Sequence, residues 1–252
     1  MDWYYYVIAV VGSALAGAIN TLAGNGSAIT LTILTEMLGL SPNIANATNR
    51  VGVVAQSFGS TWAFYANGKL EVKRSHPFLI AMLAGSVFGV IVAMRVSNEE
   101  FKAVFKFLMI FMLVVILVKP KRWLRETTAD IKPNLWVAVP VFLAIGFYGG
   151  FIQMGMGIFF LTAMVLGAKY SLMDANVVKS FAVGLYTLLA VVIFAWKGMI
   201  DWKMGLLMAF GQIIGGYIMA HYASRFAAAN LWAHRVLVIV VIAAVLRLFN
   251  VY

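Results

Sequence analysis

Two short polar clusters interrupt otherwise apolar sequence, one in each half of the chain. Their members are Asn46, Asn49 and Arg50 in the first half and Asn176, Lys179 and Ser180 in the second. The spacing i, i+3, i+4 places the three residues of each cluster on one face of a helix. An intramembrane cation is costly and usually faces a cavity or a partner. Since neither helix carries an acid at comparable depth, the pattern indicates an anionic ligand; the alternative is that both cations snorkel to the membrane surface.

A glycine-broken hydrophobic segment precedes each cluster, with the breaks at residues 24–27 and 153–157. Lipid cannot satisfy the backbone at such a break, so the break must be buried in protein or line a wet cavity. We expect a half-helix to begin after each break, near Ser27 and Ile158. The N–H groups at a helix N-terminus suit an oxyanion. The alternative is that the glycines are notches for helix packing.

These features predict a substrate site that combines the breaks, the residues just before them and the two polar clusters. Its expected members are Asn20, Gly24, Asn25, Gly26, Ser27, Asn46, Asn49, Arg50, Gln153, Gly155, Gly157, Asn176, Lys179 and Ser180. Asn20 and Gln153 either bind the ligand or cap freed backbone. The chain has no cysteine, no His/carboxylate cluster of metal-ligand type and no paired carboxylates deep in a span. We therefore expect no enzymatic activity, no cofactor and no metal.

The composition is that of a membrane protein that crosses the bilayer several times. Of the 252 residues, 63% are hydrophobic and 11% are charged, whereas soluble domains have about 25% charged residues. At about 20 residues per span, seven or eight spans fit. The net charge is +10, and most Lys and Arg fall between predicted spans, which is the positive-inside pattern and not a nucleic-acid surface.

The predicted fold is an all-α polytopic membrane protein with two homologous halves. A shift of 130 residues places Ala45-Asn46 on Ala175-Asn176 and Gly68 on Gly198. Residues 1–118 form the first half, with a broken segment at 3–40 and spans at about 44–66, 77–95 and 101–118. Residues 119–133 form a basic linker, and 134–252 form the second half, with a broken segment at about 135–168 and spans at about 174–196, 203–223 and 231–249.

The orientation of the halves depends on the broken segments. If each one returns to the face it entered from, the halves are inverted; if each crosses once, they are parallel. We favour inversion, because the pieces after the breaks are too short to span. The basic loops 67–76 and 119–133 are expected in the cytoplasm. The N-terminus lacks a basic signal-peptide region and is interpreted as a first span, which suits a bacterial inner membrane.

Together these stretches resemble the sulfite exporter TauE/SafE family of membrane permeases. The resemblance is carried by GAINTLAGNGSAITL, SPNIANATNRVGVVAQSFGSTWAFYANGKLEVK, GFIQMGMGIFFLTAMVLGAKYSLMDANVVKS and FAWKGMIDWK. It implies a permease that exports sulfite or a small organosulfonate, with the lipid bilayer as its other partner. The alternatives are a permease for another small anion, such as a carboxylate, or a non-transporting scaffold subunit. The sequence does not indicate the oligomeric state.

Overall fold

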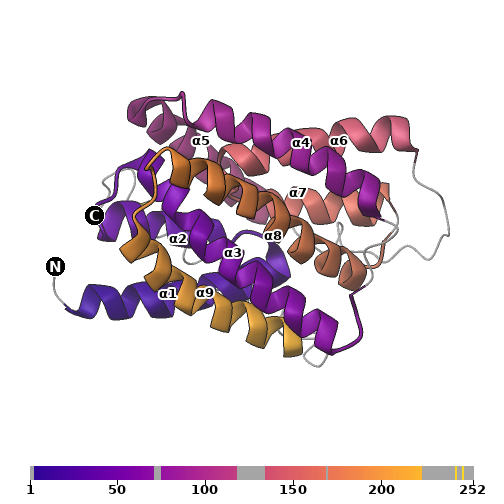
Figure 1. Cartoon of the computed structure of the whole chain (residues 1–252), viewed down its shortest axis with the longest axis horizontal. Coiled ribbons are helices and arrows are strands. Elements are labelled where there is room, and N and C mark those ends of the chain that lie inside the picture. Colours follow the sequence, from indigo (N-terminus) through magenta and orange to yellow (C-terminus); the bar gives the residue numbers. More distant parts are fainter. Residues whose placement is uncertain are drawn as a thin grey trace.

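The computed structural model describes residues 3–70, 75–117, 134–168, 170–222, 242 and 246, and every regular element among them is a helix (Figure 1). In the first half these are α1 Trp3–Ala23, α2 Gly26–Thr32, the π-helical turn η1 Ile33–Met37, α3 Pro42–Ala66, α4 His76–Ala93 and α5 Asn98–Leu117. In the second half they are α6 Leu135–Phe151, α7 Met156–Thr162, the π-helical turn η4 Ala163–Gly167, α8 Leu172–Trp196 and α9 Trp202–Tyr222. The expected linker at 119–133 and the expected span at 231–249, apart from residues 242 and 246, lie outside the described residues.

The two halves share one order of elements. In each, a helix ends at a break, a seven-residue helix and a five-residue π-helical turn follow, and a 25-residue helix comes next. The two long helices, α3 and α8, both end before a glycine with φ of +66°, Gly68 and Gly198. Glycine suits this left-handed position because it lacks a Cβ. The glycines matched in the sequence therefore have the same structural role.

Close helix pairs are made by rows of glycine. Gly85 of α4 lies against Leu143 and Phe147 of α6, and Gly89 lies one turn further along, against Phe147 and Phe151. The contacts advance in the same direction on both helices, so α4 and α6 run parallel to each other. The pair α1 and α9 packs in the same way through Gly211 and Gly215 of α9. Small residues allow the backbones to approach, as is typical of helices in membranes.

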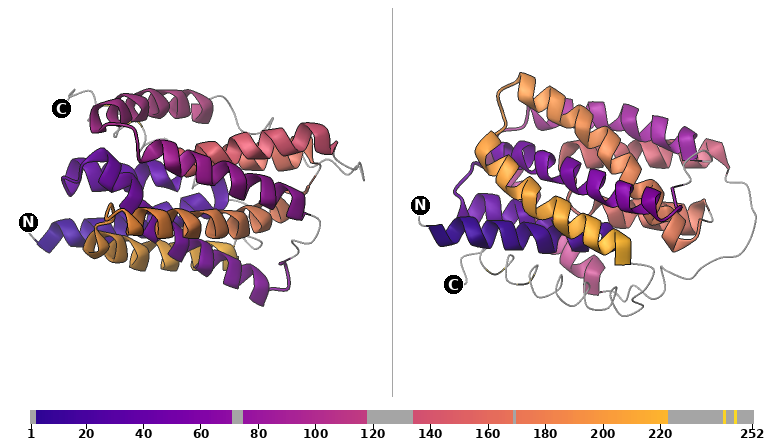
Figure 2. Two further views of the ribbon diagram at one scale, coloured as in Figure 1. Left: turned by 45° about the horizontal axis from the view of Figure 1, so that its top comes forward. Right: turned by 60° about the horizontal axis from the view of Figure 1, so that its bottom comes forward.

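The two broken segments enter the bundle from opposite ends. Asn43, at the start of α3, donates to Val96 O, just after α4, at 2.8 Å. The Asp201 N–H, before α9, donates to Thr48 Oγ1 of α3 at 3.0 Å, and Lys203 of α9 lies 3.5 Å from the hydroxyl of Tyr6 in α1. The return of α2 and η1 thus ends where α1 begins. Ser75 donates to the Tyr170 hydroxyl at 3.0 Å, so η4 returns to the end where α4 and its parallel neighbour α6 begin. Figures 1 and 2 show α1 with α2, and α6 with α7, approaching from these two ends.

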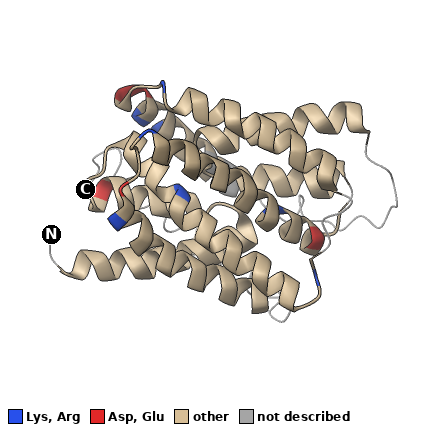
Figure 3. Ribbon diagram, viewed as in Figure 1, with Lys and Arg blue, Asp and Glu red and all other residues tan. Residues whose placement is uncertain are grey.

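The surface of the bundle is that of a protein embedded in lipid. Among the described residues, four helices are long and apolar enough to cross a membrane: α1, α4, α8 and α9. Large apolar side chains such as Phe58, Trp62, Phe88 and Phe210 are more than half exposed, which fits contact with lipid tails. The described charged residues gather mostly at the two ends of the helices (Figure 3). The chain is an integral membrane protein.

Helix α3 is long enough to cross a membrane, but its composition is too polar for it to be one of those four apolar helices. Its 25 residues would extend about 37 Å at about 1.5 Å per residue. Its buried face carries the cluster Asn46, Asn49 and Arg50, followed by Gln56 and Ser57. It packs against α8 and α9, so the most polar long helix is held inside the bundle.

Candidate functional site

The two helix breaks cross at the centre of the bundle. The Gly157 N–H donates to Gly24 O with an N···O distance of 3.1 Å. A Cβ on either glycine would collide with the backbone of the other. Gly24 also has φ of +74°, a conformation that glycine adopts without steric cost. The breaks at Gly24–Ser27 and Gly155–Ile158 therefore meet, as expected for a site that combines them, and their position near the membrane midplane stays a prediction.

The first break is closed by side chains that precede it. Asn20 Oδ1 accepts from the Gly26 N–H at 3.3 Å, and Asn20 Nδ2 donates to Gln56 Oε1 at 2.7 Å. Gln56 Nε2 donates to Thr21 Oγ1 at 2.9 Å. Asn20 thus caps the start of α2 from the end of α1, and α3 holds Asn20 in place through Gln56.

The second break is closed by Gln153, which has φ of +63°. Its Nε2 donates to the Tyr186 hydroxyl and to Thr187 Oγ1, both at 3.1 Å, and its Oε1 accepts from Arg50 at 3.0 Å. A non-glycine residue with positive φ is uncommon and needs such support. All three partners are side chains, so the side chain of Gln153 caps no freed backbone group, and its role in ligand binding stays a prediction.

The helices after the breaks begin at Gly26 and Met156, slightly earlier than expected. Several of their first N–H groups already have acceptors within the protein. Gly26 donates to Asn20 and Gly157 to Gly24, while Met156 donates to Gln153 O at 3.1 Å and Ile158 to Gly155 O at 3.0 Å. An anion bound by these N–H groups would have to displace such contacts, and its binding there stays a prediction.

Arg50 is fully buried and holds the C-terminal end of α6. Its guanidinium donates to Gly149 O, to Gly150 O at 2.9 Å and to Asn46 Oδ1 at 3.3 Å, in addition to Gln153. The last carbonyls of a helix have no partner within the helix and carry its negative dipole end. In a bilayer they need a donor from the protein, and a guanidinium supplies several donors in a fixed plane.

Lys179 does the same for α1, from the other half of the chain. Its Nζ donates to Asn20 O at 3.0 Å, Thr21 O at 2.8 Å and Asn176 Oδ1 at 2.7 Å. Each half therefore contributes a cation that caps the interrupted helix of the other half. The partners predicted from the sequence were an anion or the membrane surface, and these helix carbonyls were not among them. The breaks in the sequence could have indicated these partners, because each break leaves the negative C-terminal end of a helix inside the apolar region.

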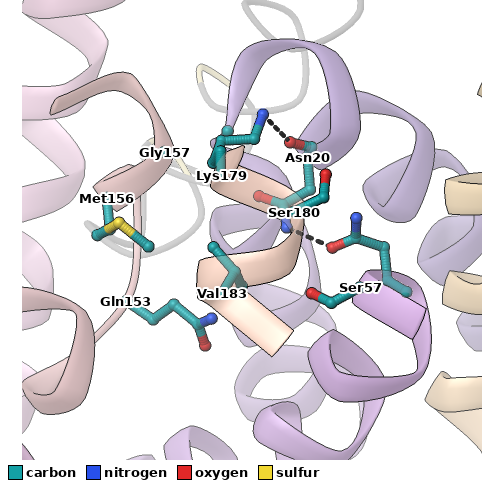
Figure 4. A pocket seen from close by; sticks show the side chains of 10 residues that line it. Asn20, Ser57, Gln153, Met156, Gly157, Lys179, Ser180 and Val183 are labelled. Atoms are coloured by element: carbon teal, nitrogen blue, oxygen red, sulfur yellow. Dashed lines mark hydrogen bonds between the residues drawn. The ribbon is translucent and has the colours of Figure 1, made fainter. Parts of the chain in front are cut away.

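A narrow polar cavity of about 10 Å³, with room for about one water molecule, lies beside the crossing of the breaks (Figure 4). Its lining comes from both breaks and from α3 and α8: Asn20, Gly24, Gln56, Ser57, Gln153, Met156, Gly157, Lys179, Ser180 and Val183. The hydroxyls of Ser57 and Ser180 are buried and have no hydrogen-bond partner among the described residues. Among the described residues that line the cavity there is no Asp or Glu, and Lys179 is the one with a formal charge.

The structure brings some of the expected site residues together and leaves others out. The cavity is lined by Asn20, Gly24, Gln153, Gly157, Lys179 and Ser180. The remaining expected residues do not line it: Asn25, Gly26, Ser27, Asn46, Asn49, Arg50, Gly155 and Asn176. Among these, Asn46 and Asn176 orient the two cations, and Asn49 Oδ1 accepts from the Thr30 hydroxyl at 2.6 Å. Ser57 was not among the expected site residues, although it lies two turns beyond Arg50 on the same helix face.

An apolar helical bundle with two broken segments that meet beside a polar cavity is an arrangement found in membrane transporters. The model of the sulfite exporter TauE/SafE family matches residues 9–248 of the chain. The chain therefore belongs to the TauE/SafE family of membrane transporters.

Its relatives are described as transporters as well. The chain is 29% identical over 238 residues to a probable membrane transporter protein, ORF9, of a Sinorhizobium species, covering 94% of this chain and 90% of that one. It is 24% identical over 241 residues to a probable membrane transporter protein of Xylella fastidiosa (strain 9a5c), covering 94% and 92%. It is 23% identical over 238 residues to the probable membrane transporter protein YunE of Bacillus subtilis, covering 85% and 87%. No solved structure was found to match the chain.

Proposed function

We propose that this transporter exports a small oxyanion, sulfite or a small organosulfonate, which binds in the cavity beside the crossing of the two breaks. The observation that carries the proposal is the chemistry of the lining. Within the described part of the chain, one lysine and two serine hydroxyls without hydrogen-bond partners line a buried space, and no carboxylate lines it. A buried hydroxyl without a partner is unfavourable, and the oxygens of a bound sulfite or sulfonate would satisfy both.

The roles divide between charge and hydrogen bonding. Lys179 already donates to three acceptors, so it supplies mainly positive potential, unless the anion replaces one of the carbonyls. Ser57 and Ser180 supply directed donors from α3 and α8. Arg50, outside the cavity, keeps the second break in place through Gln153. The N-termini of α2 and α7 would then stabilise the anion mainly through their helix dipoles and less through direct hydrogen bonds.

The direction of the helices supports an inverted relation between the halves. The segment α1–α2 and the segment α6–α7 enter and return at opposite ends of the bundle, and their crossing point lies where inverted repeats of transporters place the substrate, near the bilayer midplane. The helix ends that flank 67–76 and 119–133 lie at one end of the bundle. With their basic content, this end is assigned to the cytoplasm of a cell with the protein in its inner membrane.

Binding measured on the purified protein in lipid nanodiscs tests the proposal. Sulfite and methanesulfonate should bind, acetate should bind more weakly, and the neutral analogue dimethyl sulfone should not bind. Lys179→Gln should weaken the binding by about ten- to a hundredfold. Sulfite-loaded liposomes that contain the protein should release sulfite faster than sulfite-loaded liposomes without it. Binding of acetate in preference to both sulfur oxyanions would assign the cavity to carboxylates. Absence of binding of every anion would overturn the proposal.

A further inference from the structure

An apolar groove runs along the outer surface of the bundle between α3 and α9, which lie side by side (Figures 1 and 2). We call it the α3–α9 groove. Its volume of about 450 Å³ is within the range of about 300–1,000 Å³ that is typical of ligand pockets. Among the described residues it shares no lining residue with the polar cavity. Its lining is Phe58, Gly59 and Trp62 of α3 with Ile213, Ile214, Tyr217 and Ile218 of α9.

The shape of the α3–α9 groove follows from a glycine between large side chains. A Cβ on Gly59 would lie 2.8 Å from Ile213 O, so the missing side chain lets the two helices approach closely. Phe58 and Trp62 on α3 and Ile218 on α9 are 60%, 63% and 49% exposed. These large apolar side chains therefore form the walls of a groove whose floor is the close contact between the two helices.

The α3–α9 groove lies near the end of the bundle where both helices terminate. The helices run parallel, because the Asp201 N–H donates to Thr48 Oγ1 at their start and Asn67 Nδ2 lies 3.4 Å from His221 Nδ1 at their end. Phe58 comes eight residues before the last residue of α3, a distance of about 12 Å at about 1.5 Å per residue. In a hydrocarbon core about 30 Å thick, the groove therefore falls in the leaflet nearest to this end.

Aromatic and basic residues lie where the α3–α9 groove reaches this end. The rings of Trp62 and Tyr65 have centroids 5.9 Å apart and both side chains are exposed, as in the aromatic belts at membrane surfaces. The loop at 67–76 has three basic residues and one acid, and its first basic residue, Lys69, is exposed directly after α3. The apolar groove therefore leads to a surface of positive charge, at the end proposed above to be cytoplasmic.

We propose that the α3–α9 groove binds one acyl chain of an anionic phospholipid, whose phosphate lies at the membrane surface beside Lys69. This inference goes beyond the proposed function, because the lipid is a bound ligand and not the transported anion. A headgroup with net negative charge complements the basic end of the groove, and the apolar and aromatic lining suits a hydrocarbon chain. The bound chain would also support α3 at Phe58, next to the cavity residue Ser57.

Native mass spectrometry of the full chain, released from nanodiscs with equal parts of phosphatidylglycerol and phosphatidylcholine, tests the headgroup. One phosphatidylglycerol should stay bound with about a fivefold preference, equivalent to about 1 kcal/mol from a basic residue near the membrane surface. Lys69→Gln should remove most of this preference. Lys197→Gln is the control and should keep it, because Lys197 is also exposed but precedes α9 and so lies at the opposite end of the bundle. Equal retention of the two lipids by the unsubstituted protein would overturn the proposal.

A variant that fills the α3–α9 groove tests where the lipid lies. Ile214→Trp should remove the retained phosphatidylglycerol. Leu189→Trp is the control and should keep it, because Leu189 is equally exposed (41% for both) but lies on α8 outside the groove. Unchanged retention in Ile214→Trp would overturn the proposal. A protein dimer that dissociates in Ile214→Trp would also overturn it and would assign the groove to a second copy of the chain.

Tryptophan fluorescence gives a second readout that does not depend on release from the membrane. The chain has seven Trp, so the signal of Trp62 is taken as the difference between the protein and its Trp62→Phe variant. Phosphatidylglycerol with dibrominated acyl chains should quench this signal severalfold more than dibrominated phosphatidylcholine at the same mole fraction. Equal quenching by the two lipids would show that ordinary surrounding lipid fills the groove, and would overturn the proposal.

Discussion

The two buried cations look alike in sequence but lie in different surroundings. Arg50, on α3, contacts the end of α6, its own neighbour Asn46 and Gln153, and does not line the cavity. Lys179, on α8, contacts the end of α1 and lines the cavity. Both satisfy helix carbonyls that lipid would leave without a donor. One half therefore places its cation among helix carbonyls and amides away from the cavity, whereas the other half places its cation in the cavity wall.

Replacing Arg50 should have the largest effect, and it should be on stability. Arg50→Gln leaves buried carbonyls without donors, each at a cost of about 1–3 kcal/mol. We expect the protein to lose about 3 kcal/mol or more, measured as the unfolding midpoint in mixed detergent micelles. The exposed Arg95→Gln is the control. The anion affinity of the Arg50→Gln protein that remains folded should stay within about twofold of that of the unsubstituted protein. A large loss of anion affinity at unchanged stability would reverse the roles assigned to Arg50 and Lys179.

The crossing of the breaks should be the next most sensitive feature. Gly24→Ala combines a left-handed backbone, costing about 1–2 kcal/mol, with collision against Gly157, costing about 1–3 kcal/mol. Gly39 has a similar φ of +70° but nothing within 4 Å of an added Cβ, so Gly39→Ala should show the backbone cost alone. Gly157→Ala should show the collision alone. Equal loss of thermal stability in Gly24→Ala and Gly39→Ala would mean that the breaks do not touch.

Lys179→Gln should weaken anion binding by about ten- to a hundredfold, as expected for removal of a charged partner worth about 1.5–3 kcal/mol. Its stability should also fall, because the carbonyls of Asn20 and Thr21 lose their donor. The two variants, Lys179→Gln and Arg50→Gln, are compared by the sulfite affinity of their folded fraction, measured by calorimetric titration. Similar affinities for the two variants would remove the distinction between the cations.

The smallest effects are expected from the serines. Ser57→Ala and Ser180→Ala should each reduce sulfite affinity about three- to tenfold, since a neutral hydrogen bond contributes about 0.5–1.5 kcal/mol. Neither should lower stability, because neither hydroxyl has a partner among the described residues. Ser60→Ala is the matched control: Ser60 accepts from Gln56 at 3.3 Å and does not line the cavity. Ser60→Ala should lower the stability of the protein and leave its sulfite affinity unchanged.

Much of the architecture could be predicted from the sequence, because the membrane imposes strong rules. Glycine and amide residues inside an apolar segment must lie against protein, and this indicated the two breaks and their meeting. The lengths of the apolar stretches indicated α3, α4, α5, α8 and α9 to within a few residues. The family resemblance is confirmed by the match over residues 9–248.

The contents of the site were harder to predict, since they depend on contacts between distant residues. The sequence places Arg50 and Lys179 on equivalent helix faces, but it does not show that α6 lies against one and α1 against the other. Ser57 carries no signal beyond its position on the polar face of α3. That its hydroxyl lacks a partner, and that Gly184 of α8 stands opposite, depends on how α3 and α8 cross.

The reciprocal capping bears on how a duplicated chain diverges. With the 130-residue shift, Lys179 corresponds to Asn49 and Ser180 to Arg50, so the two cations occupy adjacent and not equivalent positions. A homodimer of one ancestral half would have had to place the same residue at both helix ends. Once a single gene encoded both halves, each end could acquire its own cation. Neither half of the present protein could therefore be replaced by a second copy of the other without leaving a helix end mismatched with its cap.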